Sequence, residues 1–225
     1  MARMKRSGMS VPYWMGWTFF RFLFLLVFRC RYFNGERVPK TGGCILAANH
    51  CSYLDPPLVG SGVRRQVGML ARKSLFRFPV FGAILRSWDA VPVDPKGGSA
   101  AGLKGILDRV ADDGAVLIFP EGTRSPDGNL LPARSGLGLM VVKTEAPVVP
   151  VRIWGTHEAY GRNSRVPKPK KLAIKFGPPL TFRSLREEAK HCSKHRLKEL
   201  YQQASDEVMS AIRDMEPILD KMNFP

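Results

Sequence analysis

Hydrophobic residues in this chain fall into short, uninterrupted runs separated by segments with helical periodicity. The runs at 44–48 (CILAA) and 115–119 (AVLIF) contain no charged side chain. Runs of this length without alternation are typical of strands buried on both faces of a sheet. Together with turn residues as boundaries, the pattern predicts strands at 44–48, 89–93, 115–119, 147–155 and 171–180, of which the last alternates like a half-buried strand.

Helical periodicity is clear at residues 98–114. Leu103, Ile106 and Val110 lie on one face there, and Gly114 suits the end of a helix. Helices are also expected at 135–146 and at 185–215, the latter as one helix or as two with a single break. Strands that alternate with helices predict an α/β fold, with a single mixed sheet flanked by helices. In such folds ligands bind beyond the carboxyl ends of the strands.

The first apolar run, residues 11–28, is longer and more aromatic than the others. It holds eight aromatic residues and has basic residues on both sides (Lys5, Arg6, Arg29 and Arg31). A helix that spans a bilayer needs roughly 20 apolar residues, and Arg21 near the middle of the run would cost about 2.5–3.5 kcal/mol there. Aromatic rings and snorkelling arginines suit the headgroup region instead.

We therefore expect residues 1–32 to form a retained N-terminal membrane-anchoring helical segment, interfacial or half-inserted, and residues 33–225 to form the α/β domain. A spanning helix and a buried core helix are the alternatives. No small-x-small cleavage site follows the run, which argues against a signal peptide. The anchor predicts a peripheral or monotopic protein on the cytoplasmic face of the cell membrane.

The balance of charge indicates an anionic partner. The chain carries 35 Lys and Arg against 19 Asp and Glu, a formal net charge of +16. Such an excess suits an anionic membrane surface, a phosphorylated substrate or nucleic acid. Three windows (1–35, 56–88 and 159–186) contain 20 of the basic residues and no acidic one. Because the sequence has no helix-turn-helix, RNP-like or zinc-finger pattern, we predict a membrane partner and no nucleic acid.

The four cysteines are scattered, which argues against a disulfide framework or a zinc module and fits a reducing cytoplasm. Cys51, beside His50, is either a nucleophile or a small residue that fills space. His191 and His195 have a spacing compatible with a metal, but they lie in a Lys- and Arg-rich helical segment. We therefore predict a solvated face there, and neither a bound metal nor a cofactor.

The stretch 47–57 (AANHCSYLDPP) places Asp55 five residues after His50, beyond the predicted strand 44–48. On a continuous helix these two residues would be turned about 140° from each other. Across a strand-to-helix turn they can meet, since the two prolines suit the first turn of a helix with Asp55 at its N-cap. Asp55 would then keep one imidazole nitrogen protonated and leave the other as a general base. By itself, the pair is better explained as two polar residues at a strand end.

A second stretch, 119–128 (FPEGTRSPDG), follows the predicted strand 115–119. Gly122 permits a sharp turn, Arg124 offers a fork of donors for phosphate oxygens, and the Thr123 hydroxyl can also donate. Glu121 is a candidate for a structural hydrogen bond or for a substrate hydroxyl. A solvated loop is the alternative.

A third stretch, 146–156 (APVVPVRIWGT), suits the wall of an apolar channel or an edge strand. In this order, NHxxxxD, FPEGTRS about 70 residues later and VVPV about 25 residues after that resemble the glycerolipid acyltransferase family. Its best-known members are the 1-acylglycerol-3-phosphate acyltransferases. The resemblance covers about residues 33–179, and the preceding run looks like the membrane-binding part of bacterial members.

The resemblance implies that the α/β domain transfers an acyl group from acyl-CoA or acyl carrier protein to the hydroxyl of a lysophospholipid. His50 matches the general base and Asp55 its orienter. Glu121, Gly122 and Arg124 match the motif that holds the acceptor's phosphate, and we add Thr123 to these substrate-binding candidates. Pro150 matches the proline of the fourth motif.

One position departs from the family pattern. Pro95 stands where the second motif usually has a phosphate-binding arginine, so Lys96, or Lys73 with its neighbour Arg72, would take that role. Arg134 stands where lysine is common. A missing phosphate ligand permits a different head group. The alternatives are therefore another lysolipid acceptor, such as a lyso-aminolipid, or a non-catalytic protein that binds anionic membranes.

Overall fold

The computed structural model describes residues 8–88, 90–93 and 100–216. The strands are β1 (Arg31–Phe33), β2 (Cys44–Ala48), β3 (Val67–Arg72), β4 (Val91–Val93), β5 (Ala115–Ile118), β6 (Val148–Trp154) and β7 (Ala173–Phe176). The α-helices are α1 (Val11–Leu26), α2 (Asp55–Gly62), α3 (Pro79–Ser87), α4 (Ala100–Ala111), α5 (Gly136–Lys143), α6 (Thr156–Tyr160), α7 (Arg183–His191) and α8 (Lys194–Arg213). Two 3-10 turns are η1 (Gly35–Arg37) and η2 (Lys73–Arg77).

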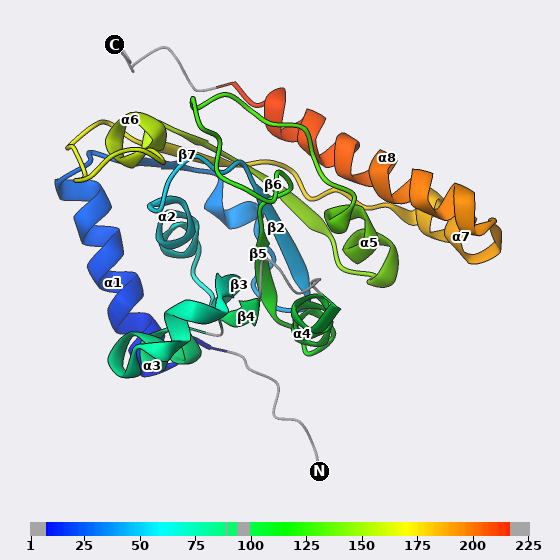
Figure 1. Cartoon of the computed structure of the whole chain (residues 1–225), viewed down its shortest axis with the longest axis horizontal. Coiled ribbons are helices and arrows are strands. Elements are labelled where there is room, and N and C mark those ends of the chain that lie inside the picture. Colours follow the sequence, from blue (N-terminus) through cyan, green and yellow to red (C-terminus); the bar gives the residue numbers. More distant parts are fainter. Residues whose placement is uncertain (1–7, 89, 94–99, 217–225) are drawn as a thin grey trace.

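The strands form one seven-stranded sheet with helices on both faces (Figure 1). Its order is β1-β7-β6-β2-β5-β3-β4. Neighbouring strands are parallel except β6 and β7, which are antiparallel. The predicted α/β class with a mixed sheet is confirmed.

The uninterrupted apolar runs arise because both faces of the central strands are covered. In β2, Leu46 belongs to a cluster with Phe24 of α1 and Leu58 of α2. Its neighbour Ile45 faces the other side, in a cluster with Leu200 of α8. All five residues of β2 and all four of β5 are buried. A strand between two helical layers has no solvent face, so no polar position interrupts its sequence.

Several elements differ from the sequence prediction. The strands β1 and β3 were not predicted, and the strand expected at 89–93 begins at Val91, with residue 89 outside the described part. The stretch from Ala173 to Phe176 is buried except at Lys175, because β7 is an interior strand and not a half-buried one. The edge-strand alternative for 146–156 is wrong for the same reason, since β6 lies between β7 and β2. The long C-terminal helix is broken at Cys192, and Ser193 caps α8.

Helix α1 packs on the domain through one face only. Phe24 is fully buried, and Trp17 Nε1 donates to the Val63 carbonyl at 2.8 Å. Arg21 also points inward, where it donates to the Ser61 carbonyl at 3.2 Å and stacks 3.7 Å from the centroid of the Tyr32 ring. The Ser61 carbonyl and the Tyr32 ring therefore compensate the charge of Arg21. The guanidinium does not project from the outer face of the helix.

The outer face of α1 is apolar and exposed (Val11, Trp14, Met15, Phe19, Phe22, Leu25 and Leu26). Across the described residues, no helix combines the length and apolar character needed to cross a bilayer. The expected boundary between an anchor at 1–32 and a domain at 33–225 stays a prediction, although Phe24 and Phe28 belong to the core of that domain.

Candidate active site

The candidate residues gather where two neighbouring parallel strands end. β2 pairs with β5 in parallel, so the loops that follow them emerge at the same edge of the sheet. The first loop carries His50 and the second carries Glu121 and Arg124. This is the edge at which α/β sheets bind their ligands.

The structure brings His50 and Asp55 into direct contact. The Nδ1–Oδ2 distance is 2.8 Å, and Oδ2 also accepts the backbone N–H groups of Cys51 and Ser52, each at 2.7 Å. Because backbone nitrogens can only donate, Oδ2 is an acceptor, and the proton of the imidazole is assigned to Nδ1. His50 Nε2 is then left as the basic nitrogen.

Asp55 occupies a different helical position from the one expected. It is the first residue of α2, and the N-cap is Leu54. The Asp55 side chain does not cap α2; it turns back toward the loop that precedes the helix. The tight turn from β2 into α2 therefore supplies two backbone donors that hold the carboxylate, and the carboxylate in turn orients the imidazole.

The imidazole is partly accessible. The side chain of His50 is 17% exposed, whereas Asp55 is fully buried. The ring of Phe119 stacks against His50, with centroids 3.8 Å apart and planes inclined by 15°. An aromatic wall on one face and a buried carboxylate at one nitrogen leave His50 few orientations.

Two hydrogen bonds to the His50 backbone join the loops that follow β2 and β5. Glu121 Oε1 accepts from the backbone N–H of His50 at 3.1 Å, and the backbone N–H of Ser125 donates to the His50 carbonyl at 2.7 Å. Both polar groups of the His50 backbone are thus satisfied by the second loop. Glu121 thus forms a structural hydrogen bond, which is one of the two roles that the sequence suggested for it.

Arg124 lies beside the same loop. Its guanidinium stacks over the ring of Tyr53 at 3.6 Å from the centroid, and its Nη1 is buried without a hydrogen-bond partner. Gly122 has a φ of +67°, and a Cβ there would lie 2.9 Å from Arg134 Cδ. Glycine therefore fits both the turn and the close approach of Arg134. Thr123 is exposed.

Glu121 is only 2% exposed, and this burial raises the pKa of its carboxyl to about 7. The backbone N–H of His50 and the charge of Arg152 act in the opposite direction. Glu121 Oε2 and two guanidinium nitrogens of Arg152 are buried without hydrogen-bond partners. Buried polar groups in folded proteins normally have a hydrogen-bond partner.

Cys51 does not have the properties of a nucleophile. Burial, together with the nearby Asp55 carboxylate, raises the pKa of its thiol to about 12. The thiol donates to the Gly128 carbonyl at 3.7 Å. A protonated, buried thiol is unreactive, which favours the space-filling interpretation.

Of the two basic candidates near the second motif, the structure describes Lys73 but not Lys96. Lys73 is exposed at the start of η2, and no described contact joins it to His50 or Arg124. Lys96 and Pro95 lie outside the described residues. The basic residue that would complete a phosphate site with Arg124 stays a prediction.

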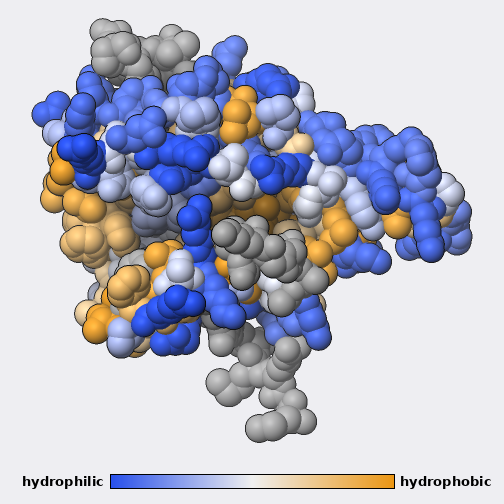
Figure 2. Space-filling model, viewed as in Figure 1, coloured by the Kyte–Doolittle hydropathy of each residue, from blue (hydrophilic) through white to orange (hydrophobic). Residues whose placement is uncertain are grey.

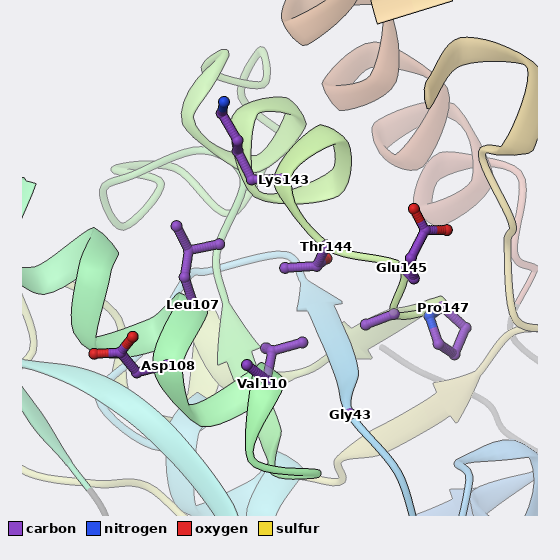
Figure 3. A pocket seen from close by; sticks show the side chains of 10 residues that line it. Gly43, Leu107, Asp108, Val110, Lys143, Thr144, Glu145 and Pro147 are labelled. Carbon is purple, nitrogen blue, oxygen red and sulfur yellow. The ribbon is translucent and has the colours of Figure 1, made fainter. Parts of the chain in front are cut away.

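A pocket of about 540 Å³ lies at the opposite edge of the sheet (Figure 3). Its lining includes Gly43 and Pro147, which directly precede β2 and β6, and Val110 near the end of α4. His50 follows the other end of β2. This pocket is therefore separate from the candidate active site.

The sequence also matches a family model. The model described as Acyltransferase matches residues 29–154, which is more than half of the chain and includes His50, Asp55, Glu121 and Arg124. The chain belongs to the acyltransferase family. The matched region thus contains both loops that meet at this edge of the sheet.

Relatives of this acyltransferase include a 1-acyl-sn-glycerol-3-phosphate acyltransferase from Cocos nucifera. It is 31% identical over 139 residues, which are 60% of this chain and 45% of the relative. One of the same name from Bacillus subtilis (strain 168) is 27% identical over 149 residues, 66% of this chain and 72% of the relative. The matched part thus spans about half of the plant protein.

A solved structure has a similar fold. The crystal structure of the 1-acyl-sn-glycerophosphate (LPA) acyltransferase PlsC from Thermotoga maritima superposes with a TM-score of 0.70 at 25% identity. The match covers 91% of this chain and 81% of that chain. The similarity therefore includes most of the described helices and strands, and not the sheet alone.

Sequence reasoning missed several residues that build the site. Phe119 and Tyr53 stack on His50 and Arg124, and Asn49 bridges to the Ile153 backbone, accepting at 2.8 Å and donating at 3.1 Å. The position of Asn49 directly before His50 could have indicated such a role. Arg152 gave no signal, because a single arginine in an apolar strand does not reveal its neighbours.

Proposed function

We propose that this acyltransferase moves a fatty acyl group from a thioester donor, acyl-CoA or acyl carrier protein, to the free hydroxyl of 1-acylglycerol 3-phosphate. The product would be phosphatidic acid. The observation that carries the proposal is the contact between His50 and the buried, backbone-held carboxylate of Asp55. The names of the relatives support the choice of acceptor.

In the proposed reaction His50 acts as the general base. Its Nε2 accepts the proton of the acceptor hydroxyl as the hydroxyl oxygen attacks the thioester carbonyl carbon. The carbon–sulfur bond then breaks, and the departing sulfur takes the proton from Nε2, so that His50 returns to its neutral state. Asp55 stabilises the transient imidazolium at Nδ1. General-base assistance of this kind typically contributes about 10²–10⁴-fold in rate.

Arg124 would hold the phosphate of the acceptor. Its side chain is fixed over Tyr53, and Nη1 has no partner within the protein. A stacked guanidinium is restricted to few orientations, and its planar donors suit phosphate oxygens. The phosphate would thereby place the acceptor hydroxyl beside His50, and this orientation would supply much of the remaining rate enhancement.

The lipid acceptor would reach the site from a membrane on which α1 rests. Seven apolar side chains project from the outer face of this helix, more than a soluble surface helix normally exposes. Arg21 faces the protein, so burial of the outer face in the headgroup region would desolvate no charge on that side. We propose peripheral or monotopic association with the cytoplasmic face of the cell membrane.

A second acceptor is favoured by one sequence observation. Pro95 occupies the position where the family commonly has a phosphate-binding arginine. A lysolipid with another head group, such as a lyso-aminolipid, would need fewer cations. Comparison of lysophosphatidate with such acceptors, at matched acyl chain and donor, would distinguish the two, since the proposed function requires the phosphate monoester to be preferred.

The decisive experiment measures acyl transfer to lysophosphatidate from acyl-CoA and from acyl carrier protein. His50→Ala should lower kcat by at least 10²-fold with either donor. His195→Ala is the matched control, because His195 is 87% exposed on α8, and it should retain wild-type activity. Unchanged transfer in a folded His50→Ala variant would exclude His50 as the base and leave a non-catalytic membrane protein as the alternative.

A further inference from the structure

A strongly basic segment between α6 and β7 lies outside the candidate active site. Residues 161–171 (GRNSRVPKPKK), which we name the basic loop, carry five cations and no acid (Arg162, Arg165, Lys168, Lys170 and Lys171). All five are exposed, and none forms an ion pair within the described part of the chain. Charges gathered without compensation on one short loop favour an anionic partner.

The basic loop begins beside the candidate active site. Ser52 Oγ donates to the carbonyl of Tyr160 at 2.6 Å, and Ser52 forms an isolated bridge with Gly161. The rings of Tyr53 and Tyr160 pack with centroids 5.8 Å apart. The start of the loop is thus fixed to the residues that follow His50.

The basic loop ends beside the C-terminal end of α1. The backbone N–H of Leu172 donates to the Phe28 carbonyl at 3.2 Å, and the N–H of Arg31 donates to the Leu172 carbonyl at 3.0 Å. In Figure 1 the yellow segment after α6 lies next to this end of the blue helix. Arg29 and Arg31, both exposed, add two further cations there.

Apolar surface continues from this end along α1 to α3. Figure 2 shows hydrophobic surface on the left side, over α1 and α3, with hydrophilic surface above it over α6 and the segment that follows. Phe78 before α3 is 63% exposed and Val80 is 76% exposed. The basic loop, the outer face of α1 and the start of α3 therefore share one side of the molecule.

We propose that the basic loop binds the anionic phospholipid headgroups of the bilayer on which the outer face of α1 rests. The inference deepens the proposed function, because it assigns the charge of the membrane that would supply the acceptor. A helix of 16 residues is about 24 Å long, and a partner that meets its apolar side and the adjacent cations together must be extended. A bilayer surface provides both chemistries at that scale.

Two features favour a bilayer over an acidic carrier protein or the phosphates of CoA. Val166 lies inside the basic loop and is 64% exposed, so the loop combines an apolar residue with its cations, as interfacial segments do. The cations also continue past the loop to Arg29 and Arg31, beside the apolar helix. Headgroup contacts would hold the sheet edge that carries His50 toward the lipid, since the basic loop is fixed to Ser52.

The test compares partition of the full chain onto two kinds of vesicle, phosphatidylcholine alone and equal parts of phosphatidylcholine and phosphatidylglycerol. A basic-loop variant carries Gln at all five cations (Arg162→Gln, Arg165→Gln, Lys168→Gln, Lys170→Gln and Lys171→Gln). Each cation near an anionic surface contributes about fivefold to partition. Because five such factors multiply, we expect the variant to bind the anionic vesicles on the order of 1,000-fold more weakly, with little change on the neutral vesicles.

A control variant removes the same number of charges elsewhere, at exposed positions on α4, α5, α7 and α8 (Lys104, Lys143, Arg183, Lys194 and Lys198, each to Gln). It should retain most of the wild-type partition. Equal losses in the two variants, or no loss in the basic-loop variant, would overturn the proposal. So would normal vesicle binding with a raised KM for acyl-CoA or acyl carrier protein in detergent, which would assign the loop to the donor. Partition requires no acyl transfer, so the result does not depend on the proposed reaction.

Discussion

At the scale of single residues, the orientation of His50 depends on one carboxylate oxygen. Asp55 Oδ2 accepts from the imidazole and from two consecutive backbone N–H groups. The backbone donors hold the carboxylate where the turn places it, so the position of the imidazole follows from the backbone and requires no further side-chain network. The imidazole can therefore be rigid although it lies on a loop.

Glu121 is the residue for which pH should matter most. Burial raises the pKa of its carboxyl from 4.5 to about 7, so between these values the native state binds a proton that the unfolded state has released. The free energy of unfolding should consequently fall as pH rises from 4.5 to 7, by about 3 kcal/mol in total from this group. Glu121→Gln should remove that part of the decline.

Urea unfolding at several pH values between 4.5 and 8 measures the effect. Glu207→Gln, at an exposed position on α8, is the matched control and should follow the wild-type profile. A Glu121→Gln variant whose unfolding free energy declines with pH as steeply as that of the wild type would show that the buried carboxyl is not responsible.

Substitution of Arg124 tests whether acceptor binding depends on the fork geometry of the guanidinium in addition to its charge. Arg124→Lys keeps the charge but loses the planar donors and the stacking on Tyr53. We expect KM for lysophosphatidate to rise about tenfold, equivalent to about 1.4 kcal/mol of binding, with a smaller change in kcat. Tyr53→Phe preserves the ring and should leave both constants near wild type. A lysine variant with unchanged KM would show that the positive charge alone suffices at this position and that the fork geometry does not matter.

At the scale of elements, α5 and α8 are held together by close backbone contacts as well as by side chains. Gly138 on α5 donates its N–H to Ser205 Oγ of α8 at 2.8 Å, and a Cβ at this position would overlap the Tyr201 carbonyl oxygen. Gly138→Ala would therefore push α8 away from α5. We expect a loss of about 1–3 kcal/mol in the free energy of unfolding.

Gly136 provides a matched control on the same helix. A Cβ there meets no atom within 4 Å, so Gly136→Ala should be neutral or should stabilise the protein by up to about 1 kcal/mol. Thermal and urea unfolding of the two variants would measure the difference. Equal stabilities would mean that α5 and α8 can separate without cost.

Strands that are buried on both faces were predictable from the sequence, whereas β1 and β3 were not. β2 and β5 are uninterrupted apolar runs because two helical layers cover them. β3 (VGMLAR) was missed because Gly and Ala are uncommon in strands, and Met, Leu and Ala favour helices. For the site, the motifs singled out His50, Asp55 and Arg124 as candidates, but not the hydrogen bonds that join the two loops. Phe119, Tyr53 and Arg152 reach the site through tertiary packing alone.

At the scale of the whole molecule, α1 is shared between the core and the outer surface. Its inner side chains Phe20 and Phe24 pack with α2 and the sheet, while Phe19 and Phe22 on the outer side are exposed. An anchor that was only tethered to the domain would expose both sides when away from a membrane. In this arrangement, the surface that would meet the lipid has a fixed orientation relative to the sheet edge that carries His50.

This arrangement predicts that α1 and the sheet unfold together. Phe24→Ala removes a fully buried ring and should lower the free energy of unfolding of the whole chain by about 3–5 kcal/mol. Phe22→Ala, on the outer face of the same helix, should change it by about 0.5 kcal/mol or less. Urea unfolding in mild detergent, followed by far-UV circular dichroism and by tryptophan fluorescence, measures both variants. If Phe24→Ala left the main transition of the sheet unchanged, α1 would be an independent anchor, and a boundary near residue 32 would separate two units that fold on their own.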